Sequence, residues 1–106
     1  MSRKDETMFI AISQFTIAND KTNEVKHAFR NRPHLVEQAA GFLRMEVISP
    51  RELPAEIWLV TYWESEADFS QWHHSHRYRE SHKGIPKGVK LVPHSVRLRF
   101  FDSVSS

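Results

Sequence analysis

The spacing of apolar residues along the chain changes between the period of a strand and that of a helix. Residues 8–17 (MFIAISQFTI) are apolar at both odd and even positions, which predicts a strand buried on both faces. Residues 42–48 and 57–63 predict two further strands, and the second of these is again a nearly continuous apolar run. Residues 96–100 alternate apolar side chains with arginines, which predicts a half-buried closing strand.

A first helix is predicted between the first two strands. Asn19 and Asp20 are candidate caps, Pro33 is expected to kink the helix, and Gly41 is placed to end it. The apolar positions that recur at helical spacing are Val25, Phe29, Val36 and Ala40.

A second helix is predicted directly after the third strand. Residues 65–68 (Ser-Glu-Ala-Asp) have the spacing of a capping box, so the helix should begin there and carry Phe69 and Trp72. Residues 76–83 can add another helical turn or two, and the glycines and proline of residues 84–88 predict a loop.

The order strand, helix, strand, strand, helix, strand predicts an α+β fold of the ferredoxin-like βαββαβ type, with a four-stranded antiparallel sheet. We expect a single domain over residues 1–106, with a core of about residues 8–101. Helices can cover only one face of such a sheet, so Ile10, Ile12 and one parity of residues 57–63 would leave a large apolar patch. The pattern therefore predicts a homodimer formed sheet against sheet.

Composition adds little until it is divided along the chain. The 106 residues carry a net charge of only +2, too small to indicate a surface that wraps nucleic acid. Eight basic and eleven acidic residues precede Arg77, whereas seven basic residues and only Glu80 lie between Arg77 and Arg99. Five of the seven histidines also follow Trp72. An anionic or metal-containing ligand is therefore expected to meet this last third.

The absence of cysteine and of long apolar runs excludes sites that need thiols and argues against a membrane protein. There is no cysteine, which excludes disulfides, zinc–thiolate sites and iron–sulfur clusters. No apolar run reaches the roughly 20 residues of a membrane span, and residues 1–7 lack the apolar segment of a signal peptide. We expect a cytoplasmic protein with neither a membrane nor a nucleic-acid partner.

Three passages carry a family resemblance. They are residues 9–17, Gly41-Phe42, and a run with the pattern Thr-x-Trp-x-Ser-x-x-x-Phe-x-x-Trp over residues 61–72, followed ten residues after Trp72 by His82. The chain resembles the antibiotic biosynthesis monooxygenase superfamily over about residues 8–101. Within it the chain is most similar to the heme-degrading monooxygenases, whose dimers form an α+β barrel.

The resemblance implies roles for two residues. His82 matches the proximal ligand of the heme iron, and Trp72 matches a pocket tryptophan that presses on the porphyrin and distorts it. Imidazole is a common axial ligand, and distortion of the macrocycle is one means by which a protein controls heme reactivity. Heme would then be both substrate and cofactor, with O2 and an external electron donor. Four basic residues flank His82 and suit the propionates: Arg77, Arg79, Lys83 and Lys87.

Ser13 departs from the pattern of the heme-degrading members, which carry an asparagine at the matching position of the first strand. Serine also donates a hydrogen bond, but its side chain is shorter. Binding of heme without degradation therefore stays open, as does a cofactor-independent monooxygenase acting on an aromatic or quinol-type molecule. A purely structural role also stays open for Trp72 as a core residue, for His82 as a surface histidine and for Ser13 as a small polar strand residue.

Other candidate residues have a structural explanation. His73 and His76 can share a helix face and suggest a metal site, but no carboxylate is spaced with them as in a metalloprotease helix. Exposed histidines on a solvated helix face are the favoured interpretation. Trp58 and Trp63 are predicted to be core residues.

Overall fold

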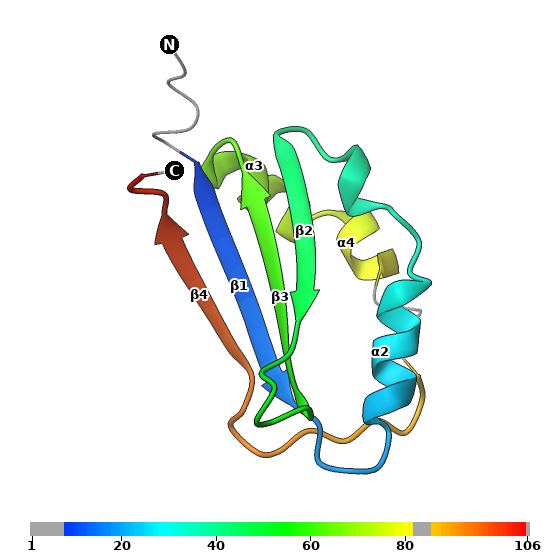
Figure 1. Ribbon diagram of the computed structural model, residues 1–106. Helices are drawn as coiled ribbons and strands as arrows, with labels where there is room; N and C mark the ends of the chain where they lie inside the picture. Colours follow the sequence, from blue (N-terminus) through cyan, green and yellow to red (C-terminus); the bar gives the residue numbers. More distant parts are fainter. Residues whose placement is uncertain (1–7, 82–85, 106) are drawn as a thin grey trace.

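Four antiparallel strands form one sheet in the order β2-β3-β1-β4, which confirms the predicted α+β, ferredoxin-like fold (Figure 1). The computed structural model describes residues 8–81 and 86–105. The strands are β1 (Phe9–Thr16), β2 (Phe42–Ile48), β3 (Glu56–Trp63) and β4 (Arg97–Asp102). The helices are α2 (Thr22–Arg30), the 3-10 turn η1 (Val36–Gln38), α3 (Glu66–His73) and α4 (His76–Ser81). None of these described helices combines the length and apolar character needed to cross a bilayer.

The strand registers define two faces of the sheet. Ala11 lies opposite Thr61 of β3 and Phe100 of β4. Because side chains alternate along a strand, one face of β1 carries Phe9, Ala11, Ser13 and Phe15, and the other carries Ile10, Ile12, Gln14 and Thr16. The helices lie on the side of the first set (Figure 1), and we call this the helix face.

Two apolar clusters fill the space between the sheet and the helices. The first joins Phe9, Ala11, Trp63 and Val36 to Phe69 and Trp72 of α3. The second joins Ile17, Val25 and Ile57, with Phe15, Phe29 and Leu59 packed against them. Ser13 is the β1 residue between Ala11 of the first cluster and Phe15 of the second. It therefore occupies the point on the helix face where one cluster gives way to the other.

The first helix is shorter than predicted. It ends at Arg30, and the chain resumes only as the turn η1, because Pro33 disfavours helical backbone before it and ends the helix instead of kinking it. The expected caps are also wrong. Lys21 occupies the cap position without a side-chain hydrogen bond, and Asn19 instead donates from Nδ2 to the Gly88 carbonyl at 2.8 Å.

The second helix begins as predicted. Ser65 is its N-cap, and its Oγ accepts from the Asp68 backbone N–H at 3.2 Å while donating to Asp68 Oδ2 at 2.9 Å. Gly41 ends no helix, but its φ of +76° turns the chain into β2, and its carbonyl accepts from the Glu64 N–H at 2.8 Å. The start of β2 is thus held against the start of α3.

Burial of β4 and of Trp58 differs from the prediction. Leu98 and Phe100 do point to the helix face, yet Phe100 is 52% exposed, although its ring meets Phe69 of α3 edge to face with centroids 5.6 Å apart. Trp58 lies on the opposite face, half-buried, where its indole N–H donates to Glu56, whereas Trp63 is fully buried as predicted. The face without helices carries a continuous apolar band: Ile10, Ile12, Trp58, Val60 and Tyr62.

Candidate functional site

Trp72 lies in the core on the helix face of the sheet. It is the seventh residue of α3, it is 9% exposed, and it belongs to the same cluster as Phe9 and Ala11 of β1. Ser13 is the next residue of β1 on that face and is half-buried opposite Leu59. The structure therefore places Trp72 and Ser13 on the same side of the sheet, whereas Gln14 points to the other side.

Tyr78 is a residue of this region that the sequence reasoning missed. Its ring meets Trp72 edge to face, with centroids 6.0 Å apart and planes at 89°, and it lies 4.7 Å from the His73 ring. Ser75 makes this contact possible, because its Oγ donates to the Trp72 carbonyl at 2.6 Å and accepts from the Tyr78 N–H at 3.1 Å. The serine cap at the break between α3 and α4 was the available sequence signal.

The environment of Tyr78 keeps its phenol neutral. Burial raises the pKa of Tyr78 above its ordinary value of 10.0, because desolvation penalises the phenolate. A neutral phenol can donate a hydrogen bond, and this one lies beside the indole of Trp72 and the imidazole of His73. Trp72 of α3 and Tyr78 of α4 therefore form an aromatic pair on the helix face of the sheet.

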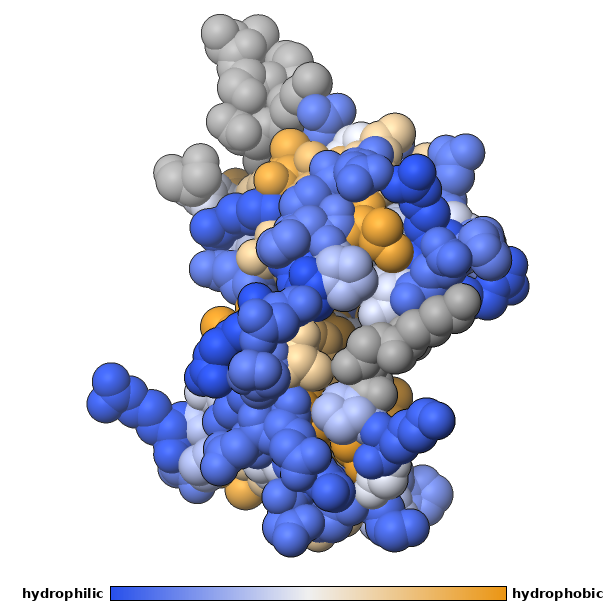
Figure 2. Space-filling view, turned by 90° about the vertical axis from the view of Figure 1, so that its right-hand side faces the viewer, coloured by the Kyte–Doolittle hydropathy of each residue, from blue (hydrophilic) through white to orange (hydrophobic). Residues whose placement is uncertain are grey.

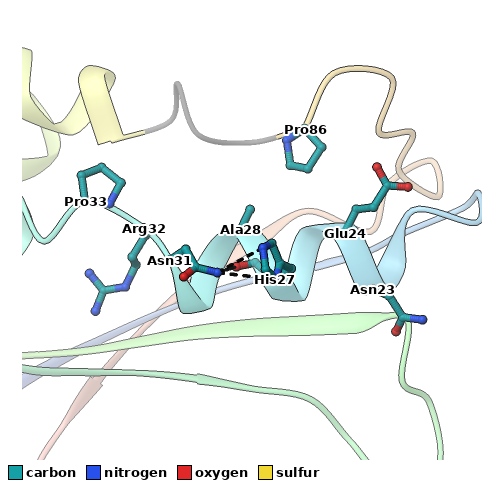
Figure 3. A pocket seen from close by; sticks show the side chains of 8 residues that line it. All are labelled: Asn23, Glu24, His27, Ala28, Asn31, Arg32, Pro33 and Pro86. Carbon is teal, nitrogen blue, oxygen red and sulfur yellow. Dashed lines mark hydrogen bonds between the residues drawn. The ribbon is translucent and has the colours of Figure 1, made fainter.

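A cavity of about 540 Å³ lies along one side of α2 (Figure 3). Polar groups from the helix line it, together with Ala28 and two prolines from the flanking loops; the full lining is Asn23, Glu24, His27, Ala28, Asn31, Arg32, Pro33 and Pro86. Asn31 Nδ2 donates to the His27 carbonyl at 3.0 Å, which holds the amide at the end of the helix. The size is typical of small-molecule sites, and the lining mixes apolar contacts with hydrogen-bonding groups. We call it the α2 cavity.

The predicted propionate-binding residues have different surroundings. Arg77 donates to Gln38 Oε1 of η1, which ties α4 to that turn, while Arg79 and Lys87 are exposed. None of these three lines the α2 cavity. His82 and Lys83 lie outside the described residues, so the ligand role of His82 and the cofactor-binding roles of all five residues stay predictions.

The histidines near α3 and α4 form no metal centre within the described parts of the chain. His73 stacks on Phe69, with ring centroids 5.2 Å apart, and His76 pairs with Glu80 at 3.4 Å across one helical turn. No group of three or more candidate ligands among the described residues could hold an ion.

Comparison with known proteins identifies the family. Residues 8–84, more than half of the chain, match the family of antibiotic biosynthesis monooxygenases. The chain belongs to this family. The match begins just before β1 and extends past α4, so it includes Ser13, Trp72, Tyr78 and His82. The coarse activity of the family, monooxygenation, is therefore the activity expected of this site.

A curated relative matches part of the chain. A mycobilin-producing heme oxygenase of Mycobacterium tuberculosis is 35% identical over 49 residues, which are 46% of this chain and 47% of that protein. The chain is thus matched over about half the length of this curated relative.

Solved structures share the fold over nearly the whole chain. A protein assigned to the antibiotic biosynthesis monooxygenases, from Bordetella bronchiseptica, has a TM-score of 0.77 at 15% identity and covers 93% of this chain and 99% of its own. SnoaB, a cofactor-independent oxygenase from Streptomyces nogalater, has a TM-score of 0.73 at 11% identity, with 94% and 96% covered. At these identities the likeness concerns the fold alone.

Proposed function

We propose that this family member binds heme and degrades it oxidatively, using O2 and electrons from an external donor, with release of iron. The observation that carries the proposal is Trp72, held on the helix face of the sheet ten residues before His82. The partial likeness to a heme oxygenase supports it. The α2 cavity is a further candidate surface for the ligand, since Pro86 of its lining follows His82 by four residues in the sequence. Trp72 and Ser13 do not line this cavity.

Each residue has a distinct role in this proposal. His82 holds the iron through a neutral imidazole, and the rigid indole of Trp72, braced by Tyr78, presses on the ring. Ser13, on the helix face of β1, donates a hydrogen bond to the bound ligand. When bound, heme supplies the oxygen-activating iron and the meso carbon that is oxidised.

The chemistry of the described residues fits such a ligand. A porphyrin is a flat apolar ring with two carboxylates at one edge, so it needs apolar walls and nearby cations. The prolines and Ala28 of the α2 cavity provide apolar contact, while its Arg32 is already paired with Glu37. Arg77, Arg79, Lys83 and Lys87 are the proposed propionate partners near His82.

Hemin titration of the purified protein tests the ligand assignment. We expect a stoichiometric Soret band that is abolished or shifted in His82→Ala. His76→Ala is the matched control, because His76 is six residues from His82 in the sequence, lies in α4, and pairs with Glu80. A spectrum unchanged in His82→Ala would overturn the assignment of His82.

Aerobic reduction of the hemin complex tests turnover. With ascorbate, O2 and catalase, loss of the Soret band with release of iron is expected. A stable Soret band would instead identify a heme-binding protein that does not degrade its ligand. The same experiment on Ser13→Asn shows whether the shorter side chain limits turnover, since asparagine restores the longer donor.

A cofactor-independent oxygenase of an aromatic or quinol-type molecule is the second candidate. The half-buried ring of Tyr78 beside Trp72 favours it, because this pair of rings offers an aromatic surface to a phenolic substrate. Such an enzyme would not bind hemin. It would oxidise electron-rich phenols in O2 without added metal, and Tyr78→Leu would lower that rate because it removes the aromatic ring.

The active unit in this proposal is a homodimer. The band of Ile10, Ile12, Trp58, Val60 and Tyr62 lies on the sheet face that no described helix covers. An apolar band across the central strands of a small domain favours association. We infer that two copies pack sheet against sheet, with the helices and the proposed sites on the outside.

A further inference from the structure

A second groove lies on another side of α2, between this helix and the latter half of the edge strand β2. Its volume is about 400 Å³, at the small end of the range for ligand sites. Its lining shares only Arg32 with the α2 cavity and consists of Lys26, Phe29, Arg30, Arg32, His34, Met45, Val47, Ile48, Ser49 and Ile57. We call it the β2 groove.

The inner part of the β2 groove is apolar. Ile57 is fully buried, and Phe29 and Val47 pack against the core cluster that contains it. Met45 extends this surface and packs against the other cluster. Because these side chains belong to the core, the apolar floor is a fixed part of the fold and needs no rearrangement to receive a ligand.

The rim of the β2 groove is cationic, and its charges are of two kinds. Arg32 is committed to Glu37 through two hydrogen bonds of 3.2 and 2.8 Å, and His34 Nδ1 lies 3.3 Å from the same carboxylate. Lys26 and Arg30 have no carboxylate partner within residues 8–81 and 86–105. They are four residues apart on α2, so the two like charges lie on one side of the helix and repel each other.

We propose that the β2 groove binds a small amphipathic carboxylate. Its charged end lies between Lys26 and Arg30, where it relieves their repulsion and forms charge-assisted hydrogen bonds. Its apolar body lies on Phe29, Met45 and Val47, where burial removes apolar surface from water. This site is separate from the function proposed above and does not depend on heme.

The two halves of the groove predict which probe binds. Octanoate carries both the charge and the apolar body, whereas inorganic phosphate has only charge and octanol has only the body. We expect saturable binding of octanoate by calorimetry, with amide shifts in α2 and in residues 45–49 by NMR. Phosphate or octanol should bind at least about tenfold more weakly than octanoate, because each lacks one of the two contributions.

Paired variants locate the binding. Lys26→Met with Arg30→Met keeps the unbranched stems and helix propensity but removes both charges, and it should weaken octanoate binding about tenfold or more. Arg97→Met with Arg99→Met is the control: it removes two exposed charges from β4, at the opposite edge of the sheet from β2, and should leave octanoate binding within about twofold. Lys26→Gln with Arg30→Gln is the second variant, to be used if the first does not fold as judged by far-UV circular dichroism.

Three outcomes would overturn the proposal. Octanoate binding that is unchanged in the Lys26 and Arg30 variants would remove the charge pair from the site. Binding that is lost in the Arg97 and Arg99 variant would place octanoate beside β4 instead. If phosphate or octanol bound as tightly as octanoate, charge alone or apolar contact alone would account for the binding.

Discussion

The side chain of Asp68 occupies the space beside Gly41 in which any other residue would place its Cβ. Gly41 also has a φ of +76°, so its position at the start of β2 depends both on left-handed backbone and on the missing side chain. Asp68 cannot easily move, because its carboxylate accepts from the Ser65 hydroxyl and its backbone N–H donates to the same hydroxyl oxygen. The β2 start and the helix that carries Trp72 are therefore fitted to each other through this one glycine.

Gly41→Ala should destabilise the protein more than Gly88→Ala. Both glycines have positive φ, but a Cβ at Gly88 meets nothing within 4 Å, so Gly88→Ala carries only the conformational cost of about 1 kcal/mol. Gly41→Ala adds the clash with Asp68, for a total of about 2–4 kcal/mol. Urea unfolding of the two variants measures the difference. Equal losses would contradict a close fit between β2 and α3.

Stability should depend on Glu37 in a defined range of pH. Hydrogen bonds from Arg32, and secondarily from His34, lower the pKa of Glu37 from its ordinary 4.5 to about 2. The native state therefore binds fewer protons than the unfolded state between these values. The stabilisation is fully present above about pH 4.5 and is lost as the pH falls toward 2.

Glu37→Gln removes this contribution. Because the pair is partly solvent-exposed, screening limits the loss at neutral pH to about 1 kcal/mol, and the variant and the wild type should converge near pH 2. Glu24→Gln is the control, since Glu24 makes one exposed contact of 3.4 Å with Lys21. Denaturant melts at pH 7, 4 and 2.5 measure both differences. A gap between Glu37→Gln and the wild type that widened on acidification would refute the assignment.

The sheet could be predicted from the sequence more fully than the helices and the site. Apolar runs and alternation identify β1 and β3 because a strand's two faces are read directly from odd and even positions. The end of α2 depends on how the backbone accommodates the restriction imposed by Pro33. The exposure of Phe100 depends on β4 being an edge strand, where the contact with Phe69 of α3 covers only part of the ring. Neither is a property of the local pattern.

The candidate site shows the same division. Ser13 and Trp72 lie in elements that the sequence predicts, and these elements place them on one side of the sheet. The alternation of residues along the strand identifies the face of Ser13, and the capping pattern at residues 65–68 identifies the helix that carries Trp72. Tyr78 was missed because it reaches Trp72 across a break between two helices, where helical spacing no longer applies. The two cavities beside α2 were also missed, since a cavity arises from packing between segments distant in the sequence.

Tyr78→Phe should remove a phenol that ionises at high pH while leaving the aromatic packing intact. Burial raises the pKa of Tyr78, so in the native state this phenol should titrate above pH 10. Because the unfolded chain releases this proton first, the stabilisation from the neutral phenol is present below pH 10 and is lost as the pH rises through the native pKa. Absorbance at about 295 nm follows the ionisation, and the late component should vanish in Tyr78→Phe.

The packing role of the same ring gives a matched comparison. Tyr78→Phe keeps the edge-to-face contact with Trp72 and should cost less than about 1 kcal/mol, whereas Tyr78→Ala removes it and should cost about 2–4 kcal/mol. Thermal and urea melts at pH 7 distinguish the two. Equal costs for both variants would mean that the hydroxyl, and not the ring, holds Tyr78 in place.

Ile12→Lys should convert the proposed dimer into a folded monomer. Ile12 pairs with Val60 in the centre of the band on the sheet face without helices, so a lysine there would bury its charge against the partner copy. In a monomer the ammonium reaches water, and the helix face of the sheet is untouched.

Light scattering after size-exclusion chromatography should give twice the 12.5 kDa chain mass for the wild type and a single chain mass for Ile12→Lys. Val104→Lys, at a position 94% exposed beyond β4, is the control and should remain dimeric. A wild-type chain that runs as a monomer, or a dimer that tolerates Ile12→Lys, would rule out sheet-against-sheet association.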